Sequence, residues 1–210
     1  TVSDGNGGTV TDTFTYTVGN PPPVAGDDTF STAEDTAVIG TVVGNDADTA
    51  PDSDALGYTL GTGTTNGTLS FNPDGTFTYT PNANFTGTDT FTYTVSDGQG
   101  GTDTATVTIT VGAVNDAPVV VTPIADQSAV DGQGVSIPTA GNFSDLDGDT
   151  LGFSVTGLPA GLTIDPVTGV ISGTIDPSAS QGGVGGVYTV VVTVSDGNGG
   201  TVTDTFTYTV

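Results

Sequence analysis

The side chains of this chain that could do chemistry are almost all carboxylates. Its 210 residues include 24 Asp and Glu but no Lys, Arg, His or Cys, so the formal net charge is −24. Nucleophilic triads, Schiff bases, thiolate or imidazole zinc sites and phosphate-binding lysines need side chains that are missing, which excludes enzymes built on them. Without cationic side chains, binding to nucleic acid or anionic membranes is not expected. Oxygen ligands remain, and these suit hard cations such as Ca²⁺.

Two groups of acidic and amide side chains are candidates for binding Ca²⁺. Each group combines the start of an expected domain, an Asp-rich loop and an Asp-Gly turn near the domain's end. In a seven-strand Greek-key sandwich these three segments lie at the same end. The first group is Asp27, Asp28, Asp46, Asp48, Asp54 and Asp97, with Asn45 and Asp52 beside them, and the second is Asn115, Asp116, Asp145, Asp147, Asp149 and Asp196.

Turn formation is the competing interpretation of both groups, because Asp, Asn and Gly are the ordinary residues of tight turns. Several carboxylates held together repel one another unless a cation lies among them, which favours a metal site. The first loop departs from the compact Asp-x-Asp-Gly-Asp pattern of the second, because it carries an insertion over residues 48–54. Candidates for a cation shared across a domain joint are Glu34, Asp35 and Asp89 in the first domain, and Asp131 and Asp176 in the second.

An 18-residue repeat organises the chain. Residues 1–18 recur without change at 193–210, and residues 94–111 match the same segment at 13 of 18 positions. The spacings of 93 and 99 residues are each the length of one immunoglobulin-like sandwich of ~100 residues. We therefore expect the final hairpin of a preceding repeat at 1–18, a complete domain at 19–111 and a second at 112–210, within a longer tandem array.

Alternation of residue types predicts an all-β fold. In residues 201–210 the odd positions are all Thr, while Val202, Phe206 and Tyr208 face the other side and are expected in the core. Asp-Gly turn signals separate such segments, and no stretch has helical periodicity or the length of a membrane span. The same alternation recurs in residues 76–80, 88–95 and 102–111.

Several motifs carry a resemblance to known families. Gly-Asn-Asp-Ala-Asp at 44–48, Phe-Asn-Pro-Asp-Gly at 71–75 and Phe-Thr-Tyr-Thr-Val-Ser-Asp-Gly at 91–98 resemble the bacterial cadherin-like tandem-95 repeat. Val-Asn-Asp-Ala-Pro at 114–118, Asp-Leu-Asp-Gly-Asp at 145–149 and Gly-Leu-Pro-Ala-Gly at 157–161 resemble the putative-Ig or dystroglycan-type cadherin-like domain. Both modules belong to giant bacterial surface proteins, including RTX-type adhesins. The resemblance implies tandem immunoglobulin/cadherin-like Greek-key β-sandwiches in an extracellular, calcium-dependent spacer.

The leading functional hypothesis is therefore a non-enzymatic stalk, formed by calcium-rigidified extension repeats of a large secreted bacterial adhesin or cell-surface protein. Its partners would be the neighbouring repeats of the same chain. The alternative is a self-assembling subunit of an extracellular filament or sheath, in which identical chains are the partners. A carbohydrate-binding accessory module is a third hypothesis, and it would need an exposed aromatic strip that the sequence does not show.

Overall fold

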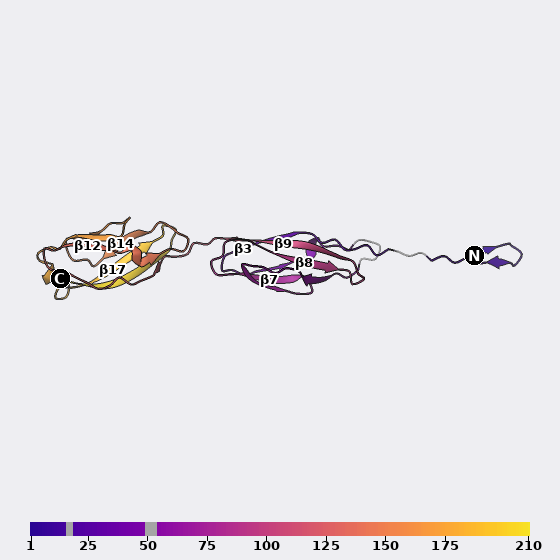
Figure 1. Cartoon of the computed structure of the whole chain (residues 1–210), viewed down its shortest axis with the longest axis horizontal. Coiled ribbons are helices and arrows are strands. Elements are labelled where there is room, and N and C mark those ends of the chain that lie inside the picture. Colours follow the sequence, from indigo (N-terminus) through magenta and orange to yellow (C-terminus); the bar gives the residue numbers. More distant parts are fainter. Residues whose placement is uncertain (16–18, 49–53) are drawn as a thin grey trace. The chain divides into compact units, whose positions relative to one another are not determined.

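The computed structural model describes residues 1–15, 19–48 and 54–210, and these divide into two compact units, Thr1–Val114 and Asn115–Val210 (Figure 1). Strands account for nearly all of the regular structure, which confirms the predicted all-β class. Helical structure in the described ranges is limited to three short 3₁₀ turns, at Val43–Asn45, Ala140–Asn142 and Ala179–Gln181. Within the same ranges, no helix has the length and apolar character needed to cross a membrane.

In the first unit, a mixed four-stranded sheet and an antiparallel three-stranded sheet enclose a core rich in aromatic rings. Phe77 and Phe91 come from different sheets, and their ring centroids lie 5.1 Å apart. Tyr79, Tyr93 and Phe91 are fully buried, as the alternation predicted. The four-stranded sheet has the order β3 (Asp28–Ala33), β9 (Thr102–Gly112), β8 (Gly87–Ser96) and β5 (Gly57–Leu60), and the three-stranded sheet has the order β4 (Val38–Thr41), β7 (Thr76–Pro81) and β6 (Gly67–Phe71).

The second unit has a similar arrangement around a core in which Ile171, Val192 and Val194 are fully buried beside four aromatic side chains, Phe143, Phe153, Phe206 and Tyr208. As in the first unit, its N-terminal region adds a strand parallel to the last one. Its four-stranded sheet has the order β11 (Gln127–Ser128), β18 (Thr201–Thr209), β17 (Val187–Ser195) and β14 (Gly152–Thr156). The other sheets are β12 (Gly134–Pro138), β16 (Val170–Thr174) and β15 (Leu162–Ile164), and the pair β10 (Val119–Val120) with β13 (Phe143–Ser144).

A short hairpin forms the beginning of the chain. Its strands, β1 (Val2–Ser3) and β2 (Thr9–Val10), are joined by a turn in which Gly5 and Gly7 have positive φ values of 79° and 96°. The same sequence forms the end of β17 and the whole of β18 in the second unit, where β18 extends over nine residues. That these first residues close a preceding repeat stays a prediction.

Candidate metal sites

The loop between β13 and β14 assembles the acidic part of the second group. Asp145, Asp147 and Asp149 each offer a carboxylate oxygen, and these three oxygens lie within 4.8 Å of one another. Gly148, with a φ of 78°, supplies the left-handed backbone conformation that turns the loop. The Asp149 amide donates to Asp145 Oδ1 at 3.2 Å, which closes the loop on itself. Three alternating carboxylates are thereby brought to one point.

Residues from the start of the unit join this loop and the closing turn. The Asp116 amide donates to Asp147 Oδ2 at 2.7 Å, and Asn115 Nδ2 donates to Asp196 Oδ2 at 2.9 Å. The three segments predicted to meet at one end of this domain therefore do meet within the second unit. A cation held by the loop would also hold the first residues of the domain in place.

One carboxylate oxygen of the loop lacks a hydrogen-bond donor. Asp145 Oδ2 is inaccessible to solvent, and no partner for it exists in the part of the chain that the structure describes. Leaving a buried polar atom unsatisfied costs about 1–3 kcal/mol, and more when the group is charged. Because Ca²⁺ is coordinated by six to eight oxygens, among them carboxylates, backbone carbonyls and amide oxygens, the loop fits this ion chemically.

Asp196 and Asp97, both candidate ligands, cap the closing turns of their domains. Asp196 Oδ1 accepts the Asn198 and Gly200 amides at 2.7 and 3.0 Å. The hydrogen bond from Asn115, aided by these amides, lowers the pKa of Asp196 against the opposing effect of burial. Burial likewise opposes ionisation of Asp97, but hydrogen bonds from its own turn and from Asn20 lower its pKa. These donors stabilise the ionised carboxylates of Asp97 and Asp196 without a cation. That either residue binds a metal ion therefore stays a prediction.

In the first unit, the hydroxyl of Tyr93 lies among acceptors. It is 3.0 Å from Asp46 Oδ1, 3.2 Å from Asp28 Oδ2 and 2.9 Å from the Gly26 carbonyl oxygen. A tyrosine hydroxyl has one proton, so it can donate to only one of these three oxygens at a time. Burial raises the pKa of Asp28 above its usual value, and the charge of Asp46 adds to the shift. Negative charge is therefore held close together here.

Further oxygens in the same region are buried without a donor. Asp46 Oδ2, Asp48 Oδ1 and the Tyr58 hydroxyl have no hydrogen-bond partner among the described residues. Tyr58 is only 5% exposed, and its pKa is raised by burial and by the charges of Asp46 and Asp28. The structure therefore brings Asp28 and Asp46 together around two tyrosine hydroxyls, and it leaves oxygens of Asp46 and Asp48 that a hard cation could satisfy.

The other candidates of the first group lie nearby but make different contacts. The Asp54 amide donates to Asp48 Oδ2 at 2.8 Å, while its carboxylate accepts from the Gln99 side chain. Asp27 Oδ1 accepts the Thr106 amide at 2.8 Å, so this carboxylate ties the start of the domain to β9. Asp52 lies outside the described residues.

Tyr58 and Tyr93 are not among the site residues that the sequence predicts. Tyr93 was assigned to the core by its alternation, and its ring is indeed fully buried. The chemistry of tyrosine could have pointed to these residues, because a tyrosine at an inward position near a strand end needs a polar partner for its hydroxyl. Here the candidate partners are the carboxylates of Asp28 and Asp46.

The acids proposed for the opposite ends of the domains have donors within their own units. Asp89 accepts the amides of Thr65, Asn66 and Thr90 and the hydroxyl of Tyr79, all at 2.8–3.2 Å. Burial opposes its ionisation, but these donors lower the pKa of Asp89. Glu34, Asp35, Asp131 and Asp176 accept backbone amides from Val114, Asn84, Ser180 and Ser178, respectively.

Comparison with known proteins finds a separate family for each unit. Residues 20–110 match the family described as "Bacterial Ig domain", and residues 117–210 match the one described as "Putative Ig domain". No curated protein sequence matches the chain. Together with the cadherin structures below, the two family matches confirm the resemblance to tandem cadherin-like, immunoglobulin-like domains.

Solved structures that resemble the chain include cadherin ectodomains. Mouse cadherin-23 EC22–24 has a TM-score of 0.60 at 20% identity, with 90% of this chain and 63% of that one covered. Human mucin-like protocadherin EC1–2 has a TM-score of 0.57 at 19% identity, with coverages of 89% and 97%. An endo-fucoidan hydrolase of glycoside hydrolase family 107 has a TM-score of 0.37 at 24% identity; the match covers 93% of this chain but 29% of the enzyme. At these identities the likeness concerns the fold alone.

Proposed function

Two immunoglobulin-like domains with a cadherin-like fold follow one another in this chain, and from that premise we propose that it is a calcium-rigidified stalk segment of a large secreted bacterial adhesin or cell-surface protein. The segment is non-enzymatic, and it holds a binding domain located elsewhere away from the cell. It works outside the cell, and its partners are neighbouring repeats of the same polypeptide.

The observation that carries the proposal is the set of buried carboxylate oxygens that lack donors. Asp145 Oδ2 in one unit, and Asp46 Oδ2 and Asp48 Oδ1 in the other, have no partner among the described residues. In the same loops, Asp147 and Asp46 accept amides from the start of their domain. A hard cation is the ligand that satisfies several such oxygens at once. When bound, Ca²⁺ supplies positive charge and coordination, while Asp145, Asp147 and Asp149, or Asp28, Asp46 and Asp48, provide the oxygens.

Stiffening follows from the hydrogen bonds of the residues that begin each domain. Asn115 and Asp116 donate to Asp196 and Asp147, and a cation at the loop would offset the repulsion between the neighbouring carboxylates of Asp116 and Asp147. In the first unit the Gly26 amide donates to Asp46 Oδ1 at 2.9 Å in the same way. Binding to the folded state alone adds about 2.7 kcal/mol at a ligand concentration 100 times Kd.

Small-angle scattering and calorimetry of the whole chain, in Ca²⁺ and then in excess chelator, test this proposal. Calcium should make the particle longer and stiffer and raise the melting temperature, and Mg²⁺ at the same concentration should do less because it prefers a rigid octahedral shell. If scattering and melting are the same in Ca²⁺ and in chelator, the calcium proposal is wrong. A monomeric rod in Ca²⁺ supports the stalk, whereas growth with protein concentration supports the filament alternative.

A further inference from the structure

Asn198, in the closing turn of the second unit, lies beside the acidic loop between β13 and β14. Its Nδ2 atom donates to Asp149 Oδ2 at 2.8 Å, and Asp149 is one of the three clustered carboxylates of that loop. An ionised carboxylate only accepts hydrogen bonds, so the amide nitrogen and not the amide oxygen faces Asp149. The side chain of Asn198 is therefore a neutral neighbour of a group of negative charges.

The residue that follows, Gly199, makes this side-chain amide chemically labile. Both residues are exposed, and Gly199 has a φ of 115° with no atom within 4 Å of the position that a Cβ would occupy. The backbone nitrogen that follows an asparagine can attack the side-chain carbonyl carbon and close a five-membered ring. Glycine favours this attack because it has no side chain and adopts the widest range of backbone conformations.

Water is the one co-reactant that the reaction needs. A bond forms between the Gly199 nitrogen and Asn198 Cγ, the Cγ–Nδ2 bond breaks, and ammonia leaves with the proton of the Gly199 amide. Water then opens the ring by adding its hydroxyl group to a ring carbonyl carbon and its proton to the ring nitrogen. Opening at Cγ gives aspartate, whereas opening at the backbone carbonyl carbon gives isoaspartate and lengthens the main chain by one methylene group.

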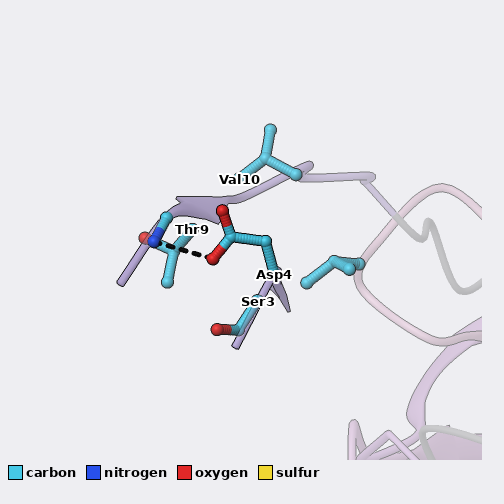
Figure 2. Close-up of a pocket in the computed structure, with 6 residues that line it drawn as sticks. Ser3, Asp4, Thr9 and Val10 are labelled. Atoms are coloured by element: carbon cyan, nitrogen blue, oxygen red, sulfur yellow. Dashed lines mark hydrogen bonds between the residues drawn. The ribbon is translucent and has the colours of Figure 1, made fainter. Parts of the chain in front are cut away.

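The closing turn of the second unit has an identical copy near the beginning of the chain. Residues 4–8 and 196–200 are both Asp-Gly-Asn-Gly-Gly. Figure 2 shows the bond that closes the first copy, in which the Gly8 amide donates to Asp4 Oδ1 at 2.9 Å, and the corresponding bond in the second copy measures 3.0 Å. Asn6 therefore offers the same Asn-Gly pair in a turn with the same local bonding.

The corresponding turn of the first unit has glutamine at this position. Gln99 donates from its side chain to Asp54 of the Asp-rich loop, just as Asn198 donates to Asp149. Glutamine would have to close a six-membered ring, which forms more slowly than a five-membered one. Of these two contacts between a turn amide and a loop carboxylate, the one in the second unit thus involves the labile amide.

The third Asn-Gly pair of the sequence, at residues 66–67, lies at the start of a strand. Gly67 pairs with Pro81 in the ladder between β6 and β7. The Asn66 amide donates to Asp89 Oδ2 at 2.8 Å, and its carbonyl oxygen accepts the Asn82 amide at 2.8 Å. Ring closure requires the backbone to rotate, and these bonds oppose the rotation. We therefore expect Asn66 to keep its amide while the protein is folded.

We propose that Asn198 is a site of spontaneous deamidation, and that the aspartate formed adds a fourth carboxylate to the metal loop of the second unit. The effect on Ca²⁺ binding rests on the proposed function, whereas the modification does not. After the reaction, a negatively charged oxygen replaces the nitrogen that donates to Asp149. Without a cation this replaces a hydrogen bond by repulsion, and with Ca²⁺ it supplies a further ligand. The second unit therefore depends more on Ca²⁺ as the protein ages.

Peptide analysis of the full chain tests the modification. The folded protein is kept in chelator at mildly alkaline pH and digested over time with chymotrypsin, because the chain has no Lys or Arg for trypsin. Cleavage after Tyr188 and Phe206 releases Asn198 in one peptide, and liquid chromatography with mass spectrometry separates its three forms. Aspartate and isoaspartate should accumulate at Asn198 much faster than at Asn66. An amide that stays intact at Asn198 in the folded chain, but is lost in the denatured chain, would overturn the proposal.

Three variants of the full chain test the effect on the metal loop. Asn198→Asp is the product of the reaction, and Asn198→Gln keeps an amide that reacts slowly, as at Gln99. Asn6→Asp is the matched control, because it makes the same change of charge in the identical turn. In calorimetric titrations, Asn198→Asp should bind Ca²⁺ roughly tenfold more tightly than Asn198→Gln, and in chelator its second unit should melt at a lower temperature. Asn6→Asp should bind Ca²⁺ like the unmodified chain.

A double variant shows whether the added carboxylate acts through the loop. The gain in affinity from Asn198→Asp should shrink when Asp145→Asn is also present, because the two carboxylates then no longer share one ion. Equal affinities of Asn198→Asp and Asn198→Gln, or an equal gain in Asn6→Asp, would overturn this inference and leave the proposed function intact. Failure of every variant and of the unmodified chain to bind Ca²⁺ would overturn both the proposed function and the gain in affinity.

Discussion

The hydroxyl of Tyr93 lies 3.0 Å from Asp46 Oδ1, at the end of a domain where two further carboxylates approach. Asp28 shares the same hydroxyl at 3.2 Å, and Asp48 has a buried oxygen without a donor among the described residues. The hydroxyl has one proton to share between the two carboxylates, and the Gly26 amide donates to Asp46 Oδ1 as well, but no cationic side chain is present to balance the negative charge. Protons at low pH and a hard cation at neutral pH are the two ways to balance it.

Asp28 provides the pH test. Because its pKa is raised in the folded protein, its contribution to stability is fully present below the unfolded value of ~3.9 and is lost as pH rises through the folded pKa. In chelator at pH 7, Asp28→Asn should therefore raise the melting temperature of the first unit by removing this repulsion. The gain should shrink toward zero as the pH falls to ~4 and below.

Melting curves of both proteins between pH 3 and 8 check this expectation, and each kcal/mol corresponds to about 4–8 °C for a domain of this size. In Ca²⁺, Asp28→Asn should instead lower the melting temperature of the first unit, because the variant lacks one ligand of the ion. A destabilised Asp28→Asn protein at pH 7 in chelator would contradict the interpretation.

Tyr93 should report ion binding in the first unit by energy transfer to Tb³⁺, a luminescent ion that takes oxygen ligands as Ca²⁺ does. Excitation of tyrosine should give terbium emission that Ca²⁺ competes away. Tyr93→Phe should lose most of the terbium emission and keep only the part excited through Tyr58. Tyr79→Phe should keep the emission, because the Tyr79 hydroxyl donates to Asp89 and not to the candidate site. Emission that survives in Tyr93→Phe and disappears in Tyr79→Phe would place the ion elsewhere.

The loop of the second unit should account for much of the stabilisation by Ca²⁺. Asp145→Asn and Asp149→Asn each remove one carboxylate from the cluster and should weaken Ca²⁺ binding by at least a factor of ten, or about 1.4 kcal/mol. Calorimetric titration with Ca²⁺ measures the change.

Asp165→Asn is the matched control for these variants. Asp165 Oδ1 accepts the Val167 and Thr168 amides in a different loop of the same unit, and Asn keeps an oxygen for these bonds while removing the same charge. A loss of affinity in the control equal to that in Asp145→Asn would show that net charge, and not the loop, governs binding.

Asp89 should be important for stability and not for ion binding. Its replacement by Ala leaves the amides of Thr65, Asn66 and Thr90 and the hydroxyl of Tyr79 without their acceptor, which should cost roughly 2–4 kcal/mol. Chemical denaturation of the first unit measures this loss, and Asp74→Asn, in an exposed turn, serves as the control.

The pH dependence of the Asp89 contribution has the opposite sign to that of Asp28. Its pKa is lowered in the folded state, so the stabilisation is present above the unfolded value of ~3.9 and is lost as pH falls through the folded pKa. Unchanged stability of Asp89→Ala, or a weaker response to Ca²⁺ at equal stability, would argue against this assignment.

Much of the fold could be predicted from the order of residue types. Alternation of Thr with Phe, Tyr and Val identified Phe91, Tyr93 and Phe206 as core positions, because a strand exposes every second residue to the same face. The meeting of three distant segments in the second domain was also predicted, and the contacts of Asn115 and Asp116 confirm it. The ligand sets remain predictions.

Other parts of the candidate sites could not be predicted from local patterns. Asp97 and Asp145 both occur in Asp-Gly-rich loops, yet Asp97 accepts turn amides, whereas one oxygen of Asp145 is buried without a donor among the residues that the structure describes. Nor does alternation show that the Tyr58 and Tyr93 hydroxyls reach toward Asp28 and Asp46. These differences depend on how the loops approach strands that lie far away in the sequence.

The identical segments 1–18 and 193–210 show which features depend on the local sequence and which depend on the tertiary structure. Both copies form the same Asp-Gly turn with the same strand register, because positive-φ glycines and the bonds of Asp4 or Asp196 to nearby amides act within a few residues. Yet the second strand covers two residues in one copy and nine in the other, and Val2 is exposed while Val194 is buried. Sequence alone determined the turn; the tertiary structure decided the strand length and the core, since only a neighbouring sheet supplies ladder partners and removes apolar side chains from water.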